Sequence, residues 1–255
     1  MKVIGKALSC AGVFCLMSAA CLAADPASGS DSHYDERMAK ARDALYANHG
    51  NQLVSLVLGE RLETQFGAGD DSTVWEAQGW VGGDLRKWWW KTEGDYGHGE
   101  GAFEEVELQS LYSRAVAPFW DVQMGVRLDV EPTPLRTYAT LGVQGVAPYW
   151  FELDAALFLS DRGDLSARLE AEYELRLTQR LLLQPRVELN VALTQDTPRG
   201  VDNGLTDVEA GLRLRYEVRR EFAPYLGAVW ARDGGGLDEE ATSGLRLVGG
   251  FRFWF

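Results

Sequence analysis

Apolar and polar residues alternate along this chain in segments of about ten residues. Residues 120–130 are the clearest case, because every even position is apolar and the odd positions carry Asp, Gln, Gly, Arg and Asp in turn. A period of two is typical of β-strands with one apolar and one polar face. The same pattern recurs at residues 168–177, 183–193 and 208–217. We therefore expect an all-β protein.

The alternation predicts twelve antiparallel strands between residue 53 and the last residue. They cover approximately residues 53–66, 74–83, 85–93, 103–114, 119–130, 136–147, 149–160, 165–177, 181–193, 207–218, 223–232 and 244–255. Twelve apolar faces are too many for one soluble core, whereas a barrel can turn them toward lipid and keep charged residues around a wet lumen. Segments of this length also suffice for a tilted strand to cross a bilayer. The predicted fold is a closed antiparallel transmembrane β-barrel of about twelve strands, of the outer-membrane type.

The connections between these strands alternate between long and short. The long connections are residues 67–73, 94–101, 131–135, 161–164, 194–206 and 233–243, and the short ones are residues 83–84, 115–118, 148, 178–180 and 219–222. Outer-membrane barrels have long external loops and short periplasmic turns. We therefore expect both termini of the barrel in the periplasm.

The N-terminus has the parts of a secretory signal peptide over residues 1–24. Lys2 and Lys6 precede an apolar run of small residues that ends in Ala23-Ala24. The run is short for a membrane anchor, and a lipoprotein site at Cys21 is a further alternative. Residues 25–52 are then a polar periplasmic segment, and residues 53–255 form the barrel.

Composition narrows the possible functions of the mature chain. All three cysteines lie in the predicted signal peptide, so neither disulfides nor thiolate-bound metal would stabilise the barrel. The whole chain has 25 basic and 38 acidic side chains, a formal net charge of −13, and cleavage would remove two more positive charges. Such acidity argues against binding to nucleic acid.

Aromatic residues cluster near the predicted strand ends, as in Trp88-Trp89-Trp90 and Tyr149-Trp150-Phe151. Aromatic girdles at the two membrane interfaces explain such clusters. At the C-terminus, Phe251, Phe253 and Phe255 face one way and the last residue is aromatic. This ending resembles the signal by which the barrel-assembly machinery recognises its substrates. We expect that machinery, outer-membrane lipid and lipopolysaccharide as partners.

The polar faces of the strands place many charges in the predicted lumen. They are Arg61, Glu63, Glu105, Glu107, Asp121, Arg127, Asp129, Glu152, Asp154, Arg168, Glu170, Glu172, Glu174, Arg186, Glu188, Glu209, Arg213, Arg215 and Glu217. A turn centred on Gln179 puts Glu172 opposite Arg186 and Glu170 opposite Glu188. Such charges either neutralise one another and plug the lumen, or leave a line of unpaired carboxylates that forms a cation path.

Several stretches of the chain resemble the copper resistance protein B family, the outer-membrane component of bacterial copper-resistance systems. The matching stretches are residues 80–84, 108–114, 118–123, 145–152, 178–181, 211–217 and 221–225, together with the C-terminal end. The resemblance implies a role in copper tolerance, by binding copper or passing it across the outer membrane, and implies a periplasmic copper-resistance protein as a partner. Family members commonly carry a Met- and His-rich N-terminal segment, which this chain lacks. Copper handling must therefore depend more on the barrel.

With copper as the expected metal, few soft or imidazole ligands are available. Copper(I) prefers sulfur ligands, and copper(II) prefers imidazole and oxygen. The candidate metal ligands are His33, Met38, His49, His98, Glu100, Asp238, Glu239 and Glu240. Met124 is in phase with the apolar face and is expected to face lipid. Copper would then be bound weakly and exchangeably.

Carboxylates in the predicted outer loops make a stronger case by number, and copper is expected to pass through an acidic mouth formed by them and through the charged lumen. They are Asp70, Asp71, Glu100, Glu131, Asp161, Asp164, Asp196, Asp202, Asp238, Glu239 and Glu240. An acidic mouth concentrates cations, although the same residues also suit ordinary solvated loops or divalent ions bound to lipopolysaccharide.

Two other functional classes need to be considered. An enzyme is not expected, because His98 stands in a Gly-rich loop with no serine within several residues and because no organic cofactor is predicted. A passive porin or structural barrel without specific metal handling is the alternative to a copper-handling barrel.

Overall fold

The structure is a computed structural model that describes residues 32–49, 52–67, 71–99, 101–195, 203–233 and 242–255. The chain divides into two compact units, residues 1–50 and 51–255. The first contains the helix α1 (Ser32–His49), whose alanine, glutamate, arginine and lysine residues favour helix formation. Lys40 and Glu36, one turn apart, form an ion pair of 3.0 Å. Sequence analysis treated this region only as polar and did not predict the helix.

No described helix is both long enough and apolar enough to span a bilayer.

The second unit consists of one antiparallel sheet. Its strands are β1 (Val54–Gly67), β2 (Ser72–Gly82), β3 (Arg86–Gly97), β4 (Ala102–Ala117), β5 (Trp120–Glu131), β6 (Arg136–Ala147), β7 (Phe151–Ser160), β8 (Leu165–Tyr173), β9 (Leu175–Arg176), β10 (Leu181–Ala192), β11 (Gly204–Tyr216), β12 (Phe222–Asp233) and β13 (Thr242–Trp254). A short 3-10 helix at Pro148–Trp150 joins β6 to β7. Every predicted strand is present, with ends displaced by a few residues.

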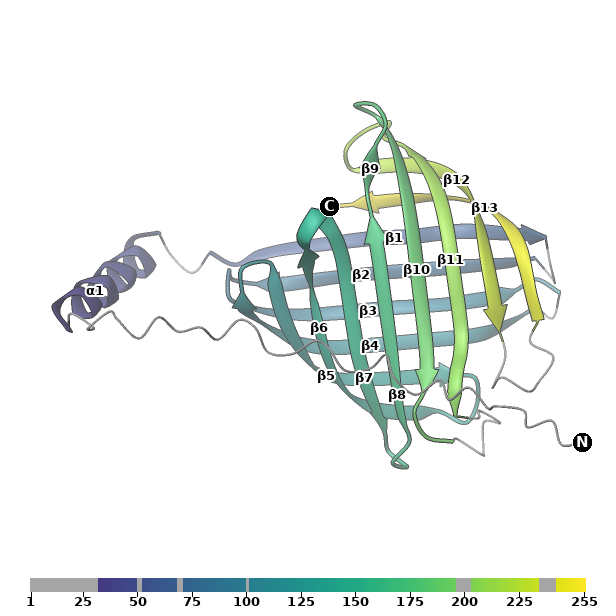
Figure 1. Ribbon diagram of the computed structural model, residues 1–255, viewed down its shortest axis with the longest axis horizontal. Coiled ribbons are helices and arrows are strands. Elements are labelled where there is room, and N and C mark those ends of the chain that lie inside the picture. The colour runs from purple at the N-terminus through teal and green to yellow at the C-terminus, as the bar shows by residue number, and fades with distance from the viewer. Residues whose placement is uncertain (1–31, 50–51, 68–70, 100, 196–202, 234–241) are drawn as a thin grey trace, which may run out of the picture. The chain divides into compact units, whose positions relative to one another are not determined.

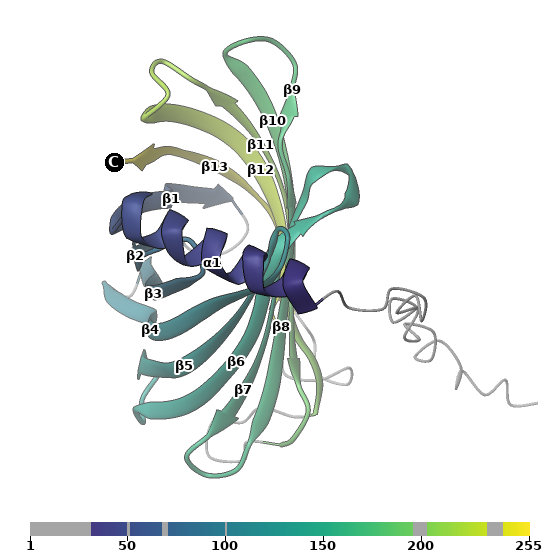
Figure 2. The same ribbon diagram turned by 90° about the vertical axis from the view of Figure 1, so that its left-hand side faces the viewer.

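The sheet closes on itself because β1 pairs with β13, and these strands lie side by side in Figures 1 and 2. β8 and β9 both pair with β10 and are separated only at Glu174, so together they occupy one place among the twelve of the described ring. Val57 and Phe255 exchange backbone hydrogen bonds of 2.9 and 3.0 Å across the closure. A Cβ atom on Gly59 would lie 2.5 Å from the ring of Phe253, so glycine there lets this ring cover the seam. The predicted closed barrel is confirmed.

The connections lie alternately at the two ends of the barrel. We call one end the loop rim, where β1, β3, β5, β7, β10 and β12 end, and the other the turn rim, where Phe255 also lies. The two longest connections, residues 193–203 and 234–241, both belong to the loop rim. The alternation in length is less strict than predicted, because the connection 217–221 at the turn rim exceeds the connection 132–135 at the loop rim.

Neighbouring residues on each strand have opposite environments. Leu108, Met124 and Leu157 on the outer face are 45%, 52% and 45% exposed, whereas Glu107 and Gln123 on the inner face are 1% and 2% exposed. Apolar residues outside and polar residues inside are the reverse of a soluble fold and match a barrel surrounded by lipid.

Candidate functional site: the charged lumen

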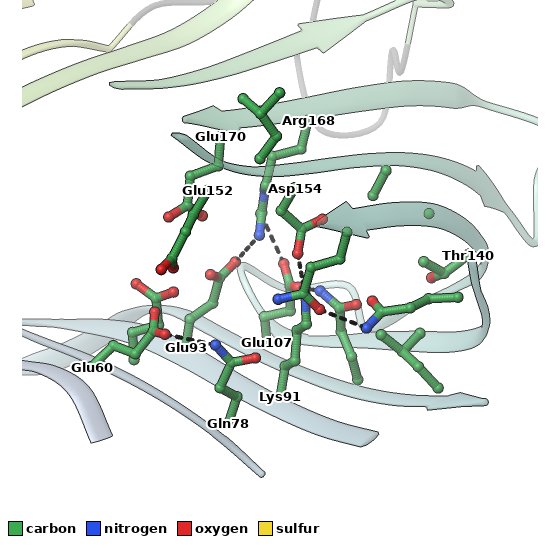
Figure 3. A pocket seen from close by; sticks show the side chains of 18 of the residues that line it. Glu60, Gln78, Lys91, Glu93, Glu107, Thr140, Glu152, Asp154, Arg168 and Glu170 are labelled. Atoms are coloured by element: carbon green, nitrogen blue, oxygen red, sulfur yellow. Dashed lines mark hydrogen bonds and ion pairs between the residues drawn. The ribbon is translucent and has the colours of Figure 1, made fainter. Parts of the chain in front are cut away.

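Charged side chains from opposite walls meet in the middle of the lumen. Arg168 on β8 contacts Glu93 on β3 and lies 3.0 Å from Glu107 on β4. Lys91 on β3 contacts Asp154 on β7. Because these partners belong to strands several places apart in the ring, the pairs cross the lumen. Figure 3 shows Arg168 reaching down to the two glutamates.

A second set of pairs crosses between β1, β2, β10 and β11. Arg61 lies 2.6 Å from Glu76 and 3.0 Å from Glu209. Arg186 lies 3.2 Å from the same Glu76, so two arginines share one carboxylate. Ion pairs removed from bulk water are favourable only when each charge has a nearby partner, and here each arginine has at least two.

The most enclosed ion pair joins Glu63 on β1 to Arg213 on β11. Arg213 donates two hydrogen bonds to the Glu63 carboxylate, at 2.8 and 2.9 Å, and the Tyr225 hydroxyl donates a third at 3.0 Å. Both charged side chains are at most 2% exposed. Paired Arg–carboxylate contacts of this kind fix the geometry as well as the charge.

The register of β8 and β10 confirms the prediction based on the turn at Gln179. Arg186 stands opposite Glu172, and Glu188 stands opposite Glu170. Arg186, however, reaches diagonally to Glu170 on β8, at 2.6 Å. It also contacts Glu188, two residues further along its own strand, at 3.0 Å. Glu172 therefore lacks the basic partner that direct opposition suggested.

An irregularity in β1 adds a charge to the lumen that simple alternation does not predict. The pairing of β1 with β2 shifts between Gly59 and Arg61, as in a β-bulge. Glu60 and Arg61 consequently both face inward, and Gln78 donates a hydrogen bond of 2.7 Å to Glu60.

A cavity of about 320 Å³ lies on the turn-rim side of the crossing pairs, and we call it the turn-side cavity. Its eight carboxylates are Glu60, Glu76, Glu93, Glu107, Glu152, Asp154, Glu170 and Glu172. Its positive side chains among the described residues are Lys91 and Arg168. The carboxylate excess makes this cavity attractive to cations, and Figure 3 shows side chains converging from both walls.

Three carboxylates of the turn-side cavity have no basic partner within ion-pair distance in the described part of the chain: Glu60, Glu152 and Glu172. Glu152 and Glu172 stand directly opposite each other on β7 and β8. Like charges in this position repel each other, and Arg252, whose ion pair is with Glu174, is close enough to act on them electrostatically without pairing with them. The lumen thus contains both arrangements considered from the sequence, compensated pairs and a group of unpaired carboxylates.

A second cavity of about 530 Å³, the loop-side cavity, lies toward the loop rim. Glu93, Phe158 and Arg168 line both cavities and form part of the wall between them. Glu93, Glu105 and Glu107 each place a carboxylate oxygen within 4.8 Å of the others. Such oxygens could hold a hard or borderline cation, although Arg168 contacts two of them.

All but one of the predicted lumen charges lie on the inner face of the barrel. Those with described ion pairs are Arg61, Glu63, Glu107, Asp121, Arg127, Asp129, Asp154, Arg168, Glu170, Glu174, Arg186, Glu188, Glu209, Arg213 and Arg215. Glu105, Glu152 and Glu172 line the cavities. Glu217 lies just beyond β11 at the turn rim and is half-buried.

The candidate metal ligands do not form one site among the described residues. His98 follows β3 at the loop rim, where its Nε2 lies 2.9 Å from the Thr73 hydroxyl. Met38 is an exposed residue of α1. The side chains of His33 and His49 in α1, and the residues Glu100, Asp238, Glu239 and Glu240, lie outside the described part of the structure. Met124 lies on the outer face, as expected.

Sequence analysis omitted several lumen charges that the structure brings into the site: Glu60, Glu76, Lys91, Glu93, Arg136 and Arg252. Glu76, Lys91 and Glu93 obey the period of two and could have been found by continuing it through the aromatic-rich strands. Glu60 required the bulge. Arg136 and Arg252 sit at strand ends, where Arg136 lies 3.3 Å from Asp164 and Arg252 lies 2.7 Å from Glu174.

Comparison with known families matches residues 53–255 to "Copper resistance protein B precursor (CopB)". The chain belongs to the copper resistance protein B family. It is 41% identical to Copper resistance protein B of Escherichia coli over 216 residues, which are 82% of this chain and 72% of the relative. It is 39% identical to the Copper resistance protein B homolog of Pseudomonas syringae pv. tomato over 226 residues, which are 84% of this chain and 76% of the relative.

Solved structures similar to this family member are porins of low sequence identity. The NanC porin aligns with a TM-score of 0.52 and 13% identity, covering 78% of this chain and 99% of the porin. The KdgM porin in complex with disordered oligogalacturonate aligns with a TM-score of 0.50 and 10% identity, covering 79% and 99%. These likenesses establish the fold, a porin-like outer-membrane β-barrel.

Proposed function

We propose that this barrel takes up copper ions into its lumen and passes them across the outer membrane, as its part in copper resistance. The single observation that carries the proposal is the group of unpaired carboxylates Glu60, Glu152 and Glu172 in the turn-side cavity of a copper resistance protein B family member. Unpaired carboxylates along a lumen favour cations, and closely spaced ones release an ion more readily when a second arrives.

The ligand chemistry favours copper(II) over copper(I). The described side chains that line the two cavities offer carboxylate, amide and hydroxyl oxygens, without sulfur or imidazole groups. Copper(I) prefers sulfur ligands, whereas copper(II) accepts oxygen ligands. Without soft ligands, binding is weak and the ion exchanges, which suits passage better than storage.

The orientation we propose places the turn rim in the periplasm and the loop rim outside the cell, because the longest connections belong to the loop rim. The turn-side cavity then opens toward the periplasm, where a copper-resistance protein is the proposed partner. His98 and the His33/Met38 segment remain the proposed auxiliary ligands for copper.

Equilibrium copper(II) loading of the purified barrel tests the proposal. The decisive variant combines Glu60→Gln, Glu152→Gln and Glu172→Gln, and we expect it to lose most of the bound copper(II). The control neutralises two exposed carboxylates at the turn rim that line neither cavity, Asp84→Asn and Glu221→Gln, and should keep the parent loading. Equal copper(II) loading of the parent and the triple lumen variant contradicts the proposal. In the parent, silver(I), a stand-in for copper(I), should bind less than copper(II).

The alternative function is a passive porin, which the porin-like fold favours. Planar-bilayer recordings separate the two possibilities. Ample potassium conductance that copper(II) leaves unchanged supports the passive porin. A small, cation-selective conductance that copper(II) alters supports copper handling.

A further inference from the structure

The wall between the two cavities is a compact layer of five side chains, which we call the barrier layer: Glu93, Glu107, Arg127, Phe158 and Arg168. Arg127 lies 2.7 Å from the Glu107 carboxylate, and Arg168 lies 3.0 Å from the same oxygen. Phe158 is 2% exposed and has the guanidinium carbons of Arg127 and Arg168 at 4.6 and 5.7 Å from its ring centre. The layer is therefore held by ion pairs and by cation–π contacts.

Arg168 has a position that the other lumen arginines lack. Among the described residues it is the arginine that lines both cavities, whereas Arg61 lines the loop-side cavity alone, and Arg186 and Arg213 line neither. Its guanidinium spans from β8 to Glu93 on β3 and Glu107 on β4, as Figure 3 shows. Asn190 accepts a further hydrogen bond of 3.0 Å from its Nε.

We infer that Arg168 is the gate residue of this lumen. Its guanidinium closes the connection between the two cavities, and a cation that crosses must take its place beside Glu93 and Glu107. The exchange preserves the local charge balance, because the arriving cation compensates the carboxylates that the guanidinium leaves. The inference relies on the proposed passage of ions through the lumen, but not on which ion passes.

The arrangement also opposes the leakage of small cations through a barrel rich in carboxylates. The unpaired carboxylates lie on the turn-rim side of the layer, where they attract cations. The positive guanidinium of Arg168 lies in the barrier layer itself and repels cations that approach from the turn-side cavity. Cations are attracted into the turn-side cavity and repelled at the barrier layer. The barrel therefore binds cations more readily than it conducts them.

Potassium conductance of the full protein in a planar bilayer tests the gate without copper. Arg168→Ala removes the side chain that lines both cavities, and we expect a severalfold rise in single-channel conductance. The control is Arg215→Ala, because Arg215 is ion-paired with Glu174 and even less exposed than Arg168 (3% against 14%) but lines neither cavity. We expect the control to keep the parent conductance.

A second variant keeps the test decisive if Arg168→Ala does not assemble. Glu93→Gln preserves the size of the side chain and weakens one attachment of the guanidinium, so conductance should rise to an intermediate level. Parent-like conductance in folded Arg168→Ala, or in Glu93→Gln when only that variant folds, overturns the gate. An equal rise in Arg215→Ala also overturns it. Copper(II) loading is measured separately, so its loss or retention bears on the proposed function and not on the gate.

Discussion

The outer and inner faces of the barrel follow different rules, although the same strands supply both. On the outer face, Leu108 and Leu157 meet a solvent of lipid chains, which requires only that a side chain be apolar. On the inner face, Glu63 needs one particular arginine at 2.8 Å. The outer face therefore depends on a class of residue, and the inner face on individual partners. Substitutions should affect the two faces in correspondingly different ways.

The largest expected effect comes from breaking the most enclosed inner pair. Glu63→Gln removes the carboxylate that Arg213 holds with two hydrogen bonds and leaves it only Glu209 at 3.4 Å; removing one member of a buried pair costs about 3 to 5 kcal/mol. Unfolding by urea in lipid vesicles measures the loss. Glu217→Gln, a half-buried neighbour of the turn rim, is the control and should change stability little. A loss as small as that of the control would mean that the inner face tolerates unpaired charge.

A smaller effect is expected when a charge is placed on the outer face. Met124→Arg puts a guanidinium against lipid near the middle of β5, at a cost of about 2 to 4 kcal/mol. Met124→Leu keeps the residue apolar and should be nearly neutral. The same unfolding assay compares the two variants, and equal stability of the arginine variant would argue that this face does not contact lipid.

The smallest effect on stability is expected at the C-terminus, where assembly is affected instead. Phe251, Phe253 and Phe255 share one face, with successive ring centres 6.2 and 6.3 Å apart. Deleting Phe255 should lower the yield in the outer membrane, while barrels that do assemble lose only the two hydrogen bonds with Val57 at the end of the closure and unfold slightly more easily than the parent. Phe255→Tyr keeps an aromatic end and should restore the yield. Normal yield in the deletion would remove support for an insertion signal at this position.

Local patterns in the chain were sufficient for much of the fold. The alternation over residues 120–130 predicted β5 within a residue at each end, and the turn at Gln179 predicted that Arg186 faces Glu172. Both succeed because a strand has a period of two and because a tight turn sets the register of its neighbours. The helix α1 escaped prediction because its apolar residues form no clear stripe.

The residues of the charged lumen could be predicted less completely from local sequence patterns. The inward direction of Glu60 depends on a one-residue bulge against β2. The alternation of apolar and polar residues does not predict this bulge. The predicted metal ligands lie in the N-terminal segment and the outer loops, whereas the described carboxylate groups lie within the barrel. Glu60 on β1 is far in the chain from Glu152 on β7 and Glu172 on β8, and the second group, Glu93, Glu105 and Glu107, comes from β3 and β4.

By itself, the sequence determined which residues form strands, which neighbours pair, and that charges lie on one face of the sheet. Each of these properties depends on residues close together in the chain or joined by a short turn. Only the tertiary structure decided that Arg168 meets Glu93, 75 positions away, and that no described basic side chain lies within ion-pair distance of Glu152 or Glu172. Closure of the ring brings opposite walls within reach of a long side chain. The distance between these walls depends on all the strands together.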